Sequence, residues 1–278
     1  MDALIRNHHR IKWRQQQGMT LIELMLVLTL SLFVIGMVFT AVLADSSAYQ
    51  ASHATNQLVN KGRMSLHTLR LYLQQAGNRE HEQVLNNVKP GPTTMTLGGF
   101  SWTWADGQVI QAQDDVSSGT ALTGSDVVAI RLYGSDSENG EVYRCTGETL
   151  GSEQLMTLLF YVSDAFELIC LDDVDNSAVV FEESIEQMQL DFVENNASQY
   201  GYVSANNVSD WANIGHFRIA LLVARAMKGA PLATSQRYDL LGTEITVGTQ
   251  LGADRSDTVG MVRQVVRDNI TLPNNRSY

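Results

Sequence analysis

The sequence predicts an α+β protein in which one long N-terminal helix packs on a mainly antiparallel, β-rich domain. Three observations support this fold class. Residues 24–44 form an uncharged apolar run, residues 45–76 space their apolar side chains as a helix does, and residues 78–278 show short β-type runs between turn-forming residues. The predicted helix therefore precedes all of the predicted strands in the chain.

The apolar run of residues 24–44 is long enough to cross a bilayer. As a helix it spans about 30 Å, the thickness of the hydrocarbon core. The preceding residues, 1–18, carry four basic side chains and one acidic side chain, so positive charge should keep that end in the cytoplasm. Glu23 stands at the edge of the run. Carrying its carboxylate to the bilayer centre would cost about 2.5 to 3.5 kcal/mol, and a lone membrane anchor does not need it.

Two other interpretations of this segment stay open. Val42-Leu43-Ala44 also has the small residues of an ordinary signal-peptidase site, which would leave a soluble periplasmic domain. Against this, the run exceeds the roughly 7 to 15 apolar residues of a secretory signal, and cleavage there gives Glu23 no role. A permanent, uncleaved anchor is the second alternative.

The second half of the predicted helix is amphipathic. Its larger apolar positions recur at helical spacing and are Leu58, Leu66, Leu69, Leu73 and Ala76. No proline interrupts residues 19–76, so Gly36 and Gly62 are the weakest points, and Gly77 is placed to cap the C-terminus. Two separate helices broken near Asp45 are the alternative.

The remaining 200 or so residues are enough for one domain with a sizeable core. The runs expected to form strands are 127–133, 141–145, 155–162, 166–171, 179–182, 188–192, 217–225 and 259–267. The polar connections 114–118, 135–140 and 195–210 are expected to be surface loops. Trp102 and Trp104 lie two apart on an expected strand and should pack on one face rather than form a sugar-binding platform.

The chain has two cysteines, Cys145 and Cys170, both in the part expected outside the cytoplasm. A single disulfide between them is the natural interpretation, and two buried free thiols are the alternative. Because there is no C-x-x-C pair, neither redox nor zinc chemistry is indicated.

The sequence gives no support for catalysis. His81-Glu82 begins like a zinc-protease helix, but Leu85 stands where the second histidine belongs, and no G-x-S-x-G or phosphate-binding loop occurs. The acidic residues 172–176 fit no register of a calcium loop and are expected to form a solvated turn. The formal charge of −11 would become −14 without residues 1–18, which disfavours nucleic acid as the main partner. We therefore expect no metal, no cofactor and no enzymatic activity.

The junction Gly18-Met19-Thr20-Leu21-Ile22-Glu23, between a basic leader and an apolar run, resembles the prepilin signature of type IV pilins and type II secretion pseudopilins. The resemblance implies a type IV pilin fold and cleavage after Gly18 by a prepilin peptidase. Residues 1–18 would be removed as a leader, and the new amine of Met19 would be methylated. Residues 19–77 would form the pilin helix and residues 78–278 the domain outside the membrane. In a filament, the Glu23 carboxylate would meet the N-terminal ammonium of a neighbouring subunit, because a buried charge needs a partner.

A second, narrower resemblance follows the cysteines. The segments 143–147, 160–162, 167–170, 185–192, residue Trp211 and the terminal 265–272 succeed one another as in the PilW-type minor pilins. Residues 270–275 depart from the Val-x-Leu-Arg-Asn run that the family more often has, and residues 120–124 match nothing in it.

This resemblance implies a scarce subunit, anchored in the inner membrane with its domain in the periplasm. It would join other minor pilins in a priming complex that starts pilus assembly and then stays at the pilus tip. The implied partners are those minor pilins, the major pilin, the assembly platform, the prepilin peptidase and a PilY-type tip adhesin. Rival interpretations are a J-type minor pseudopilin of type II secretion and a membrane-tethered binding domain that only borrows pilin export.

Overall fold

The structure, a computed structural model, describes residues 18–117, 119–136, 140–195, 201–226, 236–246 and 260–275. Its two compact units are Met1–Ala51 and Ser52–Tyr278. Residues 1–17 of the expected leader (1–18) and the start of the expected strand 259–267 lie outside the described residues.

The long helix α1 (Leu21–Leu73) is continuous over 53 residues, so the alternative of two helices broken near Asp45 is wrong. Gly36 and Gly62 both lie inside it. Apolar side chains are exposed along its first half, and α1 is the one helix among the described residues whose length and composition suffice to cross a bilayer. Its buried residues belong to the second half and include the predicted positions Leu58, Leu66, Leu69 and Leu73.

The end of α1 differs from the expectation for Gly77. The helix stops at Leu73, and the N–H groups of Gln75 and Ala76 donate to carbonyls three residues back, which tightens the last turn. Gly77 adopts a φ of 75°, but its N–H donates to the Arg131 carbonyl at 2.8 Å rather than to α1. Gly77 therefore turns the chain onto the sheet and does not cap the helix.

At Gly62, α1 packs closely against side chains of the sheet. A Cβ at this position would lie 2.6 Å from Cγ1 of Val266 and 3.3 Å from Cγ2 of Val223. At Gly36, by contrast, a Cβ would meet nothing within 4 Å. The residue that looked like a weak point of the helix is required because strand side chains fill the space that a larger residue would need.

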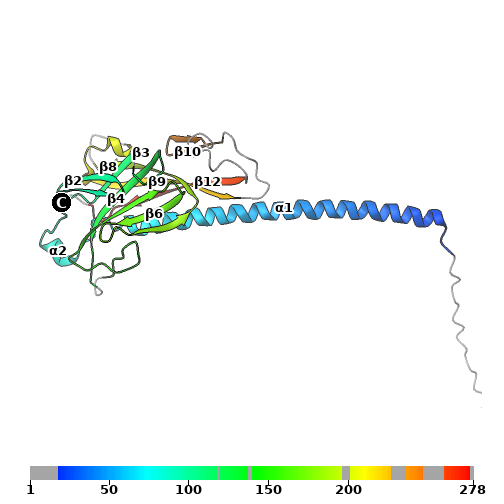
Figure 1. The fold of residues 1–278 in the computed structure, drawn as a ribbon, viewed down its shortest axis with the longest axis horizontal. Helices are drawn as coiled ribbons and strands as arrows, with labels where there is room; N and C mark the ends of the chain where they lie inside the picture. The colour runs from blue at the N-terminus through cyan, green and yellow to red at the C-terminus, as the bar shows by residue number, and fades with distance from the viewer. Residues whose placement is uncertain are drawn as a thin grey trace, which may run out of the picture. The chain divides into compact units, whose positions relative to one another are not determined.

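Every strand pair is antiparallel, as predicted, among the described residues. One five-stranded sheet has the order β3-β4-β5-β6-β7, a three-stranded sheet has the order β12-β9-β8, and β1-β2 and β10-β11 are hairpins (Figure 1). The elements that follow α1 are α2 (His81–Leu85), β1 (Thr93–Leu97), β2 (Phe100–Trp104), β3 (Ile110–Val116), β4 (Ser125–Tyr133), β5 (Leu155–Val162), β6 (Glu167–Asp172), β7 (Ala178–Glu183), β8 (Ile185–Glu194), η1 (Ala205–Asn207), η2 (Trp211–Asn213), β9 (Ile214–Ala226), β10 (Arg237–Leu240), β11 (Thr243–Thr246) and β12 (Met261–Thr271).

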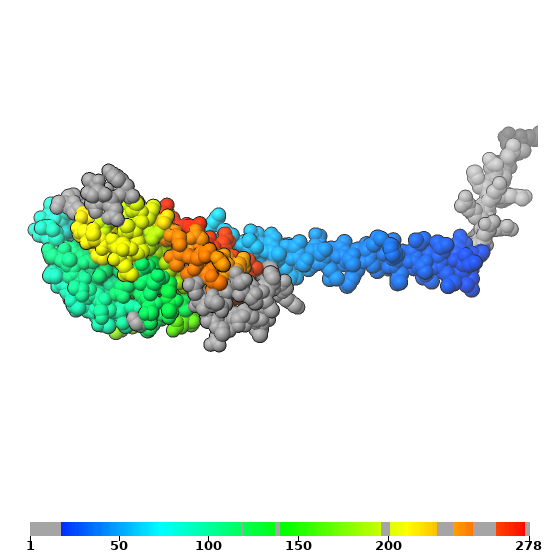
Figure 2. Space-filling view, turned by 90° about the horizontal axis from the view of Figure 1, so that it is seen from above, coloured from blue at the N-terminus to red at the C-terminus, as the bar shows by residue number. Residues whose placement is uncertain are grey.

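The five-stranded sheet is covered on both faces. One face shares the main core with the second half of α1 and the three-stranded sheet. The hairpin β1-β2 closes a smaller core on the other face, where Trp102 and Trp104 are buried and their rings stack with centroids 6.2 Å apart. The tryptophan pair therefore packs, as expected. Hairpin β10-β11, orange in Figure 2, lies on the surface beside the red β12.

Two expectations about local structure are wrong. Residues 114–118 were expected to be a loop, but β3 continues to Val116 through a bulge that holds Asp114 and Asp115. Residues 141–145 were expected to be a strand, but they form a loop with one isolated bridge, between Tyr143 and Thr149. A turn at Gly147, whose N–H donates to the Arg144 carbonyl, folds this segment back on itself.

Side chains of β4, rather than a backbone ladder, connect the two sheets. Ser125 Oγ donates to the Met188 carbonyl at 3.2 Å and accepts from the Met188 N–H at 3.1 Å. The Asp126 carboxyl accepts from the N–H of Leu190 at 2.7 Å and from that of Asp115 at 2.9 Å. The carboxyl of Asp126 thus holds β8 and the β3 bulge together.

Burial raises the pKa of Asp126 to about 8, and the nearby Asp114 carboxylate adds to the rise, although the two backbone N–H groups oppose it. Between about pH 4 and pH 8 the folded chain therefore keeps a proton that the unfolded chain has lost. The free energy of unfolding should fall as pH rises through this window, by at most about 1.4 kcal/mol per pH unit from this group.

We expect Asp126→Asn to flatten this dependence, because the amide does not ionise, whatever it does to absolute stability. Thermal unfolding of the full chain in detergent, followed at several pH values across the window, measures the slope. Asp164→Asn, at an exposed turn, is the control. An unchanged slope in Asp126→Asn would contradict the assignment.

Candidate functional site

The predicted processing junction lies immediately before α1. Gly18, Met19 and Thr20 are exposed and not helical, and a Cβ at Gly18 would meet nothing within 4 Å. The peptide bond between Gly18 and Met19 is therefore outside the helix, where its backbone groups are not engaged in helical hydrogen bonds.

Glu23 lies in the first turn of α1, and its N–H donates to Thr20 Oγ1 at 3.3 Å. Thr20 and Glu23 have the Ser/Thr-x-x-Glu spacing of a capping box, and a carboxylate in the first turn interacts favourably with the helix dipole. This local role was not predicted, although the spacing of Thr20 and Glu23 signals it. Capping does not provide a counter-charge, and Glu23 forms no ion pair with any residue that the structure describes.

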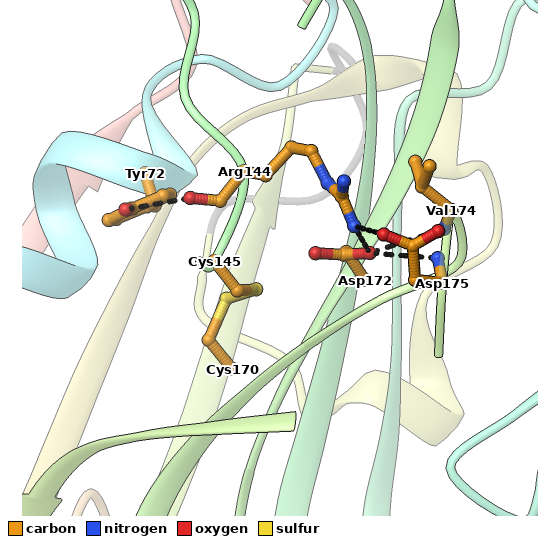
Figure 3. Close-up of a disulfide and its surroundings, with 7 residues drawn as sticks. All are labelled: Tyr72, Arg144, Cys145, Cys170, Asp172, Val174 and Asp175. Atoms are coloured by element: carbon orange, nitrogen blue, oxygen red, sulfur yellow. Dashed lines mark hydrogen bonds and ion pairs between the residues drawn. A yellow bond between two sulfur atoms is a disulfide. The ribbon is translucent and has the colours of Figure 1, made fainter. Parts of the chain in front are cut away.

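The predicted disulfide is present. Cys145 and Cys170 are bonded, with their Cα atoms 5.7 Å apart, and both side chains are buried (Figure 3). The bond attaches the loop of residues 141–150 to the central part of the five-stranded sheet. Tyr72 of α1 donates its hydroxyl to the Arg144 carbonyl at 3.3 Å, so the helix also holds this loop.

Arg144 provides the positive charge for the acidic turn after β6. Its Nη2 donates to Asp172 Oδ1 at 3.0 Å and to the Asp175 carboxylate (Figure 3). Its Nη1 donates to Glu148 Oε2 at 2.8 Å. The bond to Asp172, followed by that to Asp175, raises the pKa of Arg144. The N–H groups of Val174 and Asp175 also donate to Asp172 Oδ1.

The expectation of a solvated acidic turn is therefore wrong for Asp172, which is fully buried and ion-paired. The sequence did contain a signal. Arg144 precedes Cys145 and Asp172 follows Cys170 by two, so a disulfide between the cysteines brings these two charges together. The guanidinium occupies the position beside the carboxylates where a cation would otherwise be expected.

One group of carboxylates was not anticipated. Single oxygens of Asp114, Asp115 and Asp126 all lie within 4.8 Å of one another, and only Asp126 is buried. We assign no ion to this group, because both oxygens of Asp126 already accept backbone N–H groups.

Removing the disulfide should lower stability. Closing the loop between Cys145 and Cys170 contributes about 3 kcal/mol in the chain-entropy model, so the double variant Cys145→Ser/Cys170→Ser should unfold at a clearly lower urea concentration. Nonreducing peptide mapping of the exported chain checks the bond itself. Wild-type protein with both thiols free, or a double variant as stable as wild type, would contradict this prediction.

Comparison with known proteins gives two family matches. Residues 13–39 match the prokaryotic N-terminal methylation motif, and residues 161–274 match the type IV pilus-assembly protein W family. No curated protein matches the chain. Among solved structures, a type IV-like pilin from Thermus thermophilus is 11% identical with a TM-score of 0.42, covering 79% of this chain and 98% of its own. A similarity of that size does not define a fold, which rests here on α1 and the strand pairing.

A methylation motif at the start of a membrane-length helix, followed by an antiparallel β domain, defines a protein of the type IV pilin class. Within this class, residues 161–274 of the chain are similar to the PilW family of type IV pilus-assembly proteins. The pilin family is structural and non-catalytic, which confirms the prediction that the chain is not an enzyme. The motif and the apolar half of α1 indicate anchoring in the inner membrane before assembly.

Proposed function

We propose that this protein is a minor pilin that acts in the priming complex of a type IV pilus and then remains at the pilus tip. The observation that carries the proposal is that one chain combines two features. The processing junction at Gly18 and Met19 directly precedes a continuous α1, and the end of α1 is built into a PilW-type domain. A tethered binding domain would need the export signal but would not need a continuous helix built into a PilW-type domain.

In this proposal a prepilin peptidase removes residues 1–18, and Met19 becomes the methylated N-terminus of the mature chain. The exposed, non-helical junction supports this step, since a protease needs an accessible backbone. The mature chain then holds an ammonium group four residues before Glu23.

Assembly depends on Glu23 meeting the N-terminal ammonium of a neighbouring subunit. Within the described residues the Glu23 backbone N–H is capped by Thr20 Oγ1 but the carboxylate has no ion-paired cation, so its counter-charge would come from another chain. In the low dielectric among packed apolar helices, an unpaired carboxylate is costly and a paired one is tolerated. The partners are the other minor pilins, the major pilin, the assembly platform and a PilY-type adhesin at the tip.

Co-purification from pilus-producing cells tests the proposal. A tagged full-length chain should bring down the other minor pilins, and deleting its gene should reduce the number of pili on the cell surface. Normal piliation in the deletion strain, with type II secretion lost instead, would establish the pseudopilin alternative. Normal piliation without recovery of any minor pilin would favour a tethered domain.

A further inference from the structure

A polar groove lies where the segment after α1, the α2-β1 connection, the β2-β3 connection and the chain after β12 meet. Its volume is about 410 Å³. Arg79 and Lys89 line it together with Asp106 and the side-chain amides of Asn87, Asn274 and Asn275. The function proposed above assigns no role to this groove.

The charge of the groove is opposite to that of the chain. The whole protein carries −11, yet two cations and one carboxylate line this surface. Arg79 and Lys89 form no ion pair with any residue that the structure describes. By contrast, the described basic residues that are ion-paired number seven and are Lys61, Arg70, Arg144, Arg218, Arg237, Arg263 and Arg267.

The two cations of the groove are held to different degrees by their neighbours. Arg79 Nη1 donates to the Val88 carbonyl at 2.9 Å, which directs the guanidinium toward the residue next to Lys89. Cδ of Lys89 lies 3.4 Å from the point that a Cβ on Gly107 would occupy, so its stem lies against this glycine. The Arg79 guanidinium is therefore positioned before any ligand arrives, which lowers the entropy lost on binding, whereas the Lys89 ammonium is exposed.

The walls of the groove are also tied together. The Gly107 N–H donates to the Pro90 carbonyl at 2.9 Å, and the Tyr133 hydroxyl donates to the Lys89 carbonyl at 3.3 Å. Asn275 Nδ2 donates to the Ile214 carbonyl at 2.8 Å, which fixes the chain after β12. A groove bounded by four segments joined in this way is preformed.

We propose that this groove binds a short acidic segment of another pilus subunit, with carboxylates paired to Arg79 and Lys89. A guanidinium presents a fork of donors that matches a carboxylate, and the amides of Asn87 and Asn274 can donate to its remaining lone pairs. A long polyanion such as nucleic acid, or an anionic membrane surface, would be repelled by the rest of this acidic chain. A short acidic segment needs only local complementarity. The identity of the partner rests on the proposed function, whereas carboxylate binding does not.

Lys89→Glu is the most direct test, because Lys89 is exposed and its side chain forms no hydrogen bond that folding would lose. Arg225→Glu is the matched control, because this substitution makes the same change of charge. Arg225 is exposed at the end of β9, outside the groove. The full-length protein in detergent is titrated with a fluorescent oligoglutamate peptide. We expect Lys89→Glu to weaken binding by about tenfold or more and Arg225→Glu to change it little.

Wild type that does not bind the peptide, or equal weakening in both variants, would overturn the proposal. So would binding to phosphatidylglycerol vesicles that Lys89→Glu abolishes while peptide binding persists, because the groove would then recognise phosphate. Arg79→Gln tests the charge of Arg79 apart from its hydrogen bond to Val88. The glutamine keeps a donor for the Val88 carbonyl but has no positive charge, so it should still weaken peptide binding.

A photo-crosslinking amino acid at position 89, in pilus-producing cells, should attach to an acidic segment of another pilus subunit. A crosslink to a segment without carboxylates would contradict the proposal. If Lys89→Glu leaves minor-pilin co-purification intact while Glu23→Gln abolishes it, the groove inference fails and the proposed function stands. If the peptide binds as predicted but no minor pilin co-purifies with wild type, the proposed function fails and carboxylate binding stands.

Discussion

Glu23→Gln should leave the chain inserted and cleaved. Its association with neighbouring subunits should weaken roughly a thousandfold, so that little of it enters pili. Removing one partner of a buried ion pair costs about 3 to 5 kcal/mol, which accounts for a loss of that size. Glutamine serves as well as glutamate in a capping box, so the hydrogen bond between the residue 23 N–H and Thr20 should persist and α1 should begin at the same residue. Only the charge is lost.

The measurement is pilus number and recovery of partner minor pilins in a strain that carries only the variant. Glu82→Gln, at an exposed position of α2, makes the same chemical change and should have no effect. A processed protein that does not enter pili would support the charge pair. Normal piliation together with normal recovery of minor pilins would rule it out, and Glu23 would then serve only as part of the helix cap.

Glu186→Gln or Arg263→Met alone should destabilise the domain by about 3 to 5 kcal/mol. Arg263 Nε donates to Glu186 Oε2 at 2.6 Å and Nη2 donates to Oε1 at 3.3 Å, so the pair is bidentate. The side chains are 4% and 0% exposed, and the pair connects β12 to β8 across the intervening β9. Either single change leaves a charge buried without its partner.

Urea unfolding of the full chain in detergent measures this effect. Replacing both partners with apolar residues, in Glu186→Leu/Arg263→Met, should recover most of the loss, because no charge is then buried. The control is Arg237→Met, which breaks an ion pair with Glu244 on hairpin β10-β11 that is 68% and 62% exposed and should change stability by less than about 1 kcal/mol. Equal losses at the two sites would mean that burial of the Glu186 pair has no special effect.

The sequence predicted the elements whose hydrophobic pattern fits only one kind of secondary structure. α1 was expected in both halves, and β5 begins and ends where the apolar run 155–162 does, because a strand covered on both faces is apolar throughout. Elements with exposed or polar positions were harder. Strand β1 and hairpin β10-β11 are short and β3 carries a bulge with two aspartates, so neither alternation nor composition marks them clearly.

The candidate sites divide in the same way. Gly18, Met19 and Glu23 form a contiguous motif, and Cys145 and Cys170 were the only cysteines, so local sequence and compartment were enough to nominate them. The buried pair joins Glu186 to Arg263, and the groove brings Arg79 and Lys89 close to Asn274, so both depend on residues far apart in the chain. Their proximity depends on strand order and on the path after α1, which a single sequence does not specify.

The mass of the mature N-terminal peptide tests the central claim most directly. Protein recovered from pilus-producing cells should begin at a methylated Met19, and replacing Gly18 with a bulky residue should leave the longer, unprocessed chain, because the scissile backbone must fit a confined site. A mature chain that begins at Asp45 would establish ordinary signal cleavage, remove most of the apolar half of α1 and contradict the assembly role. An uncleaved chain in cells that process their other pilins would contradict it as well.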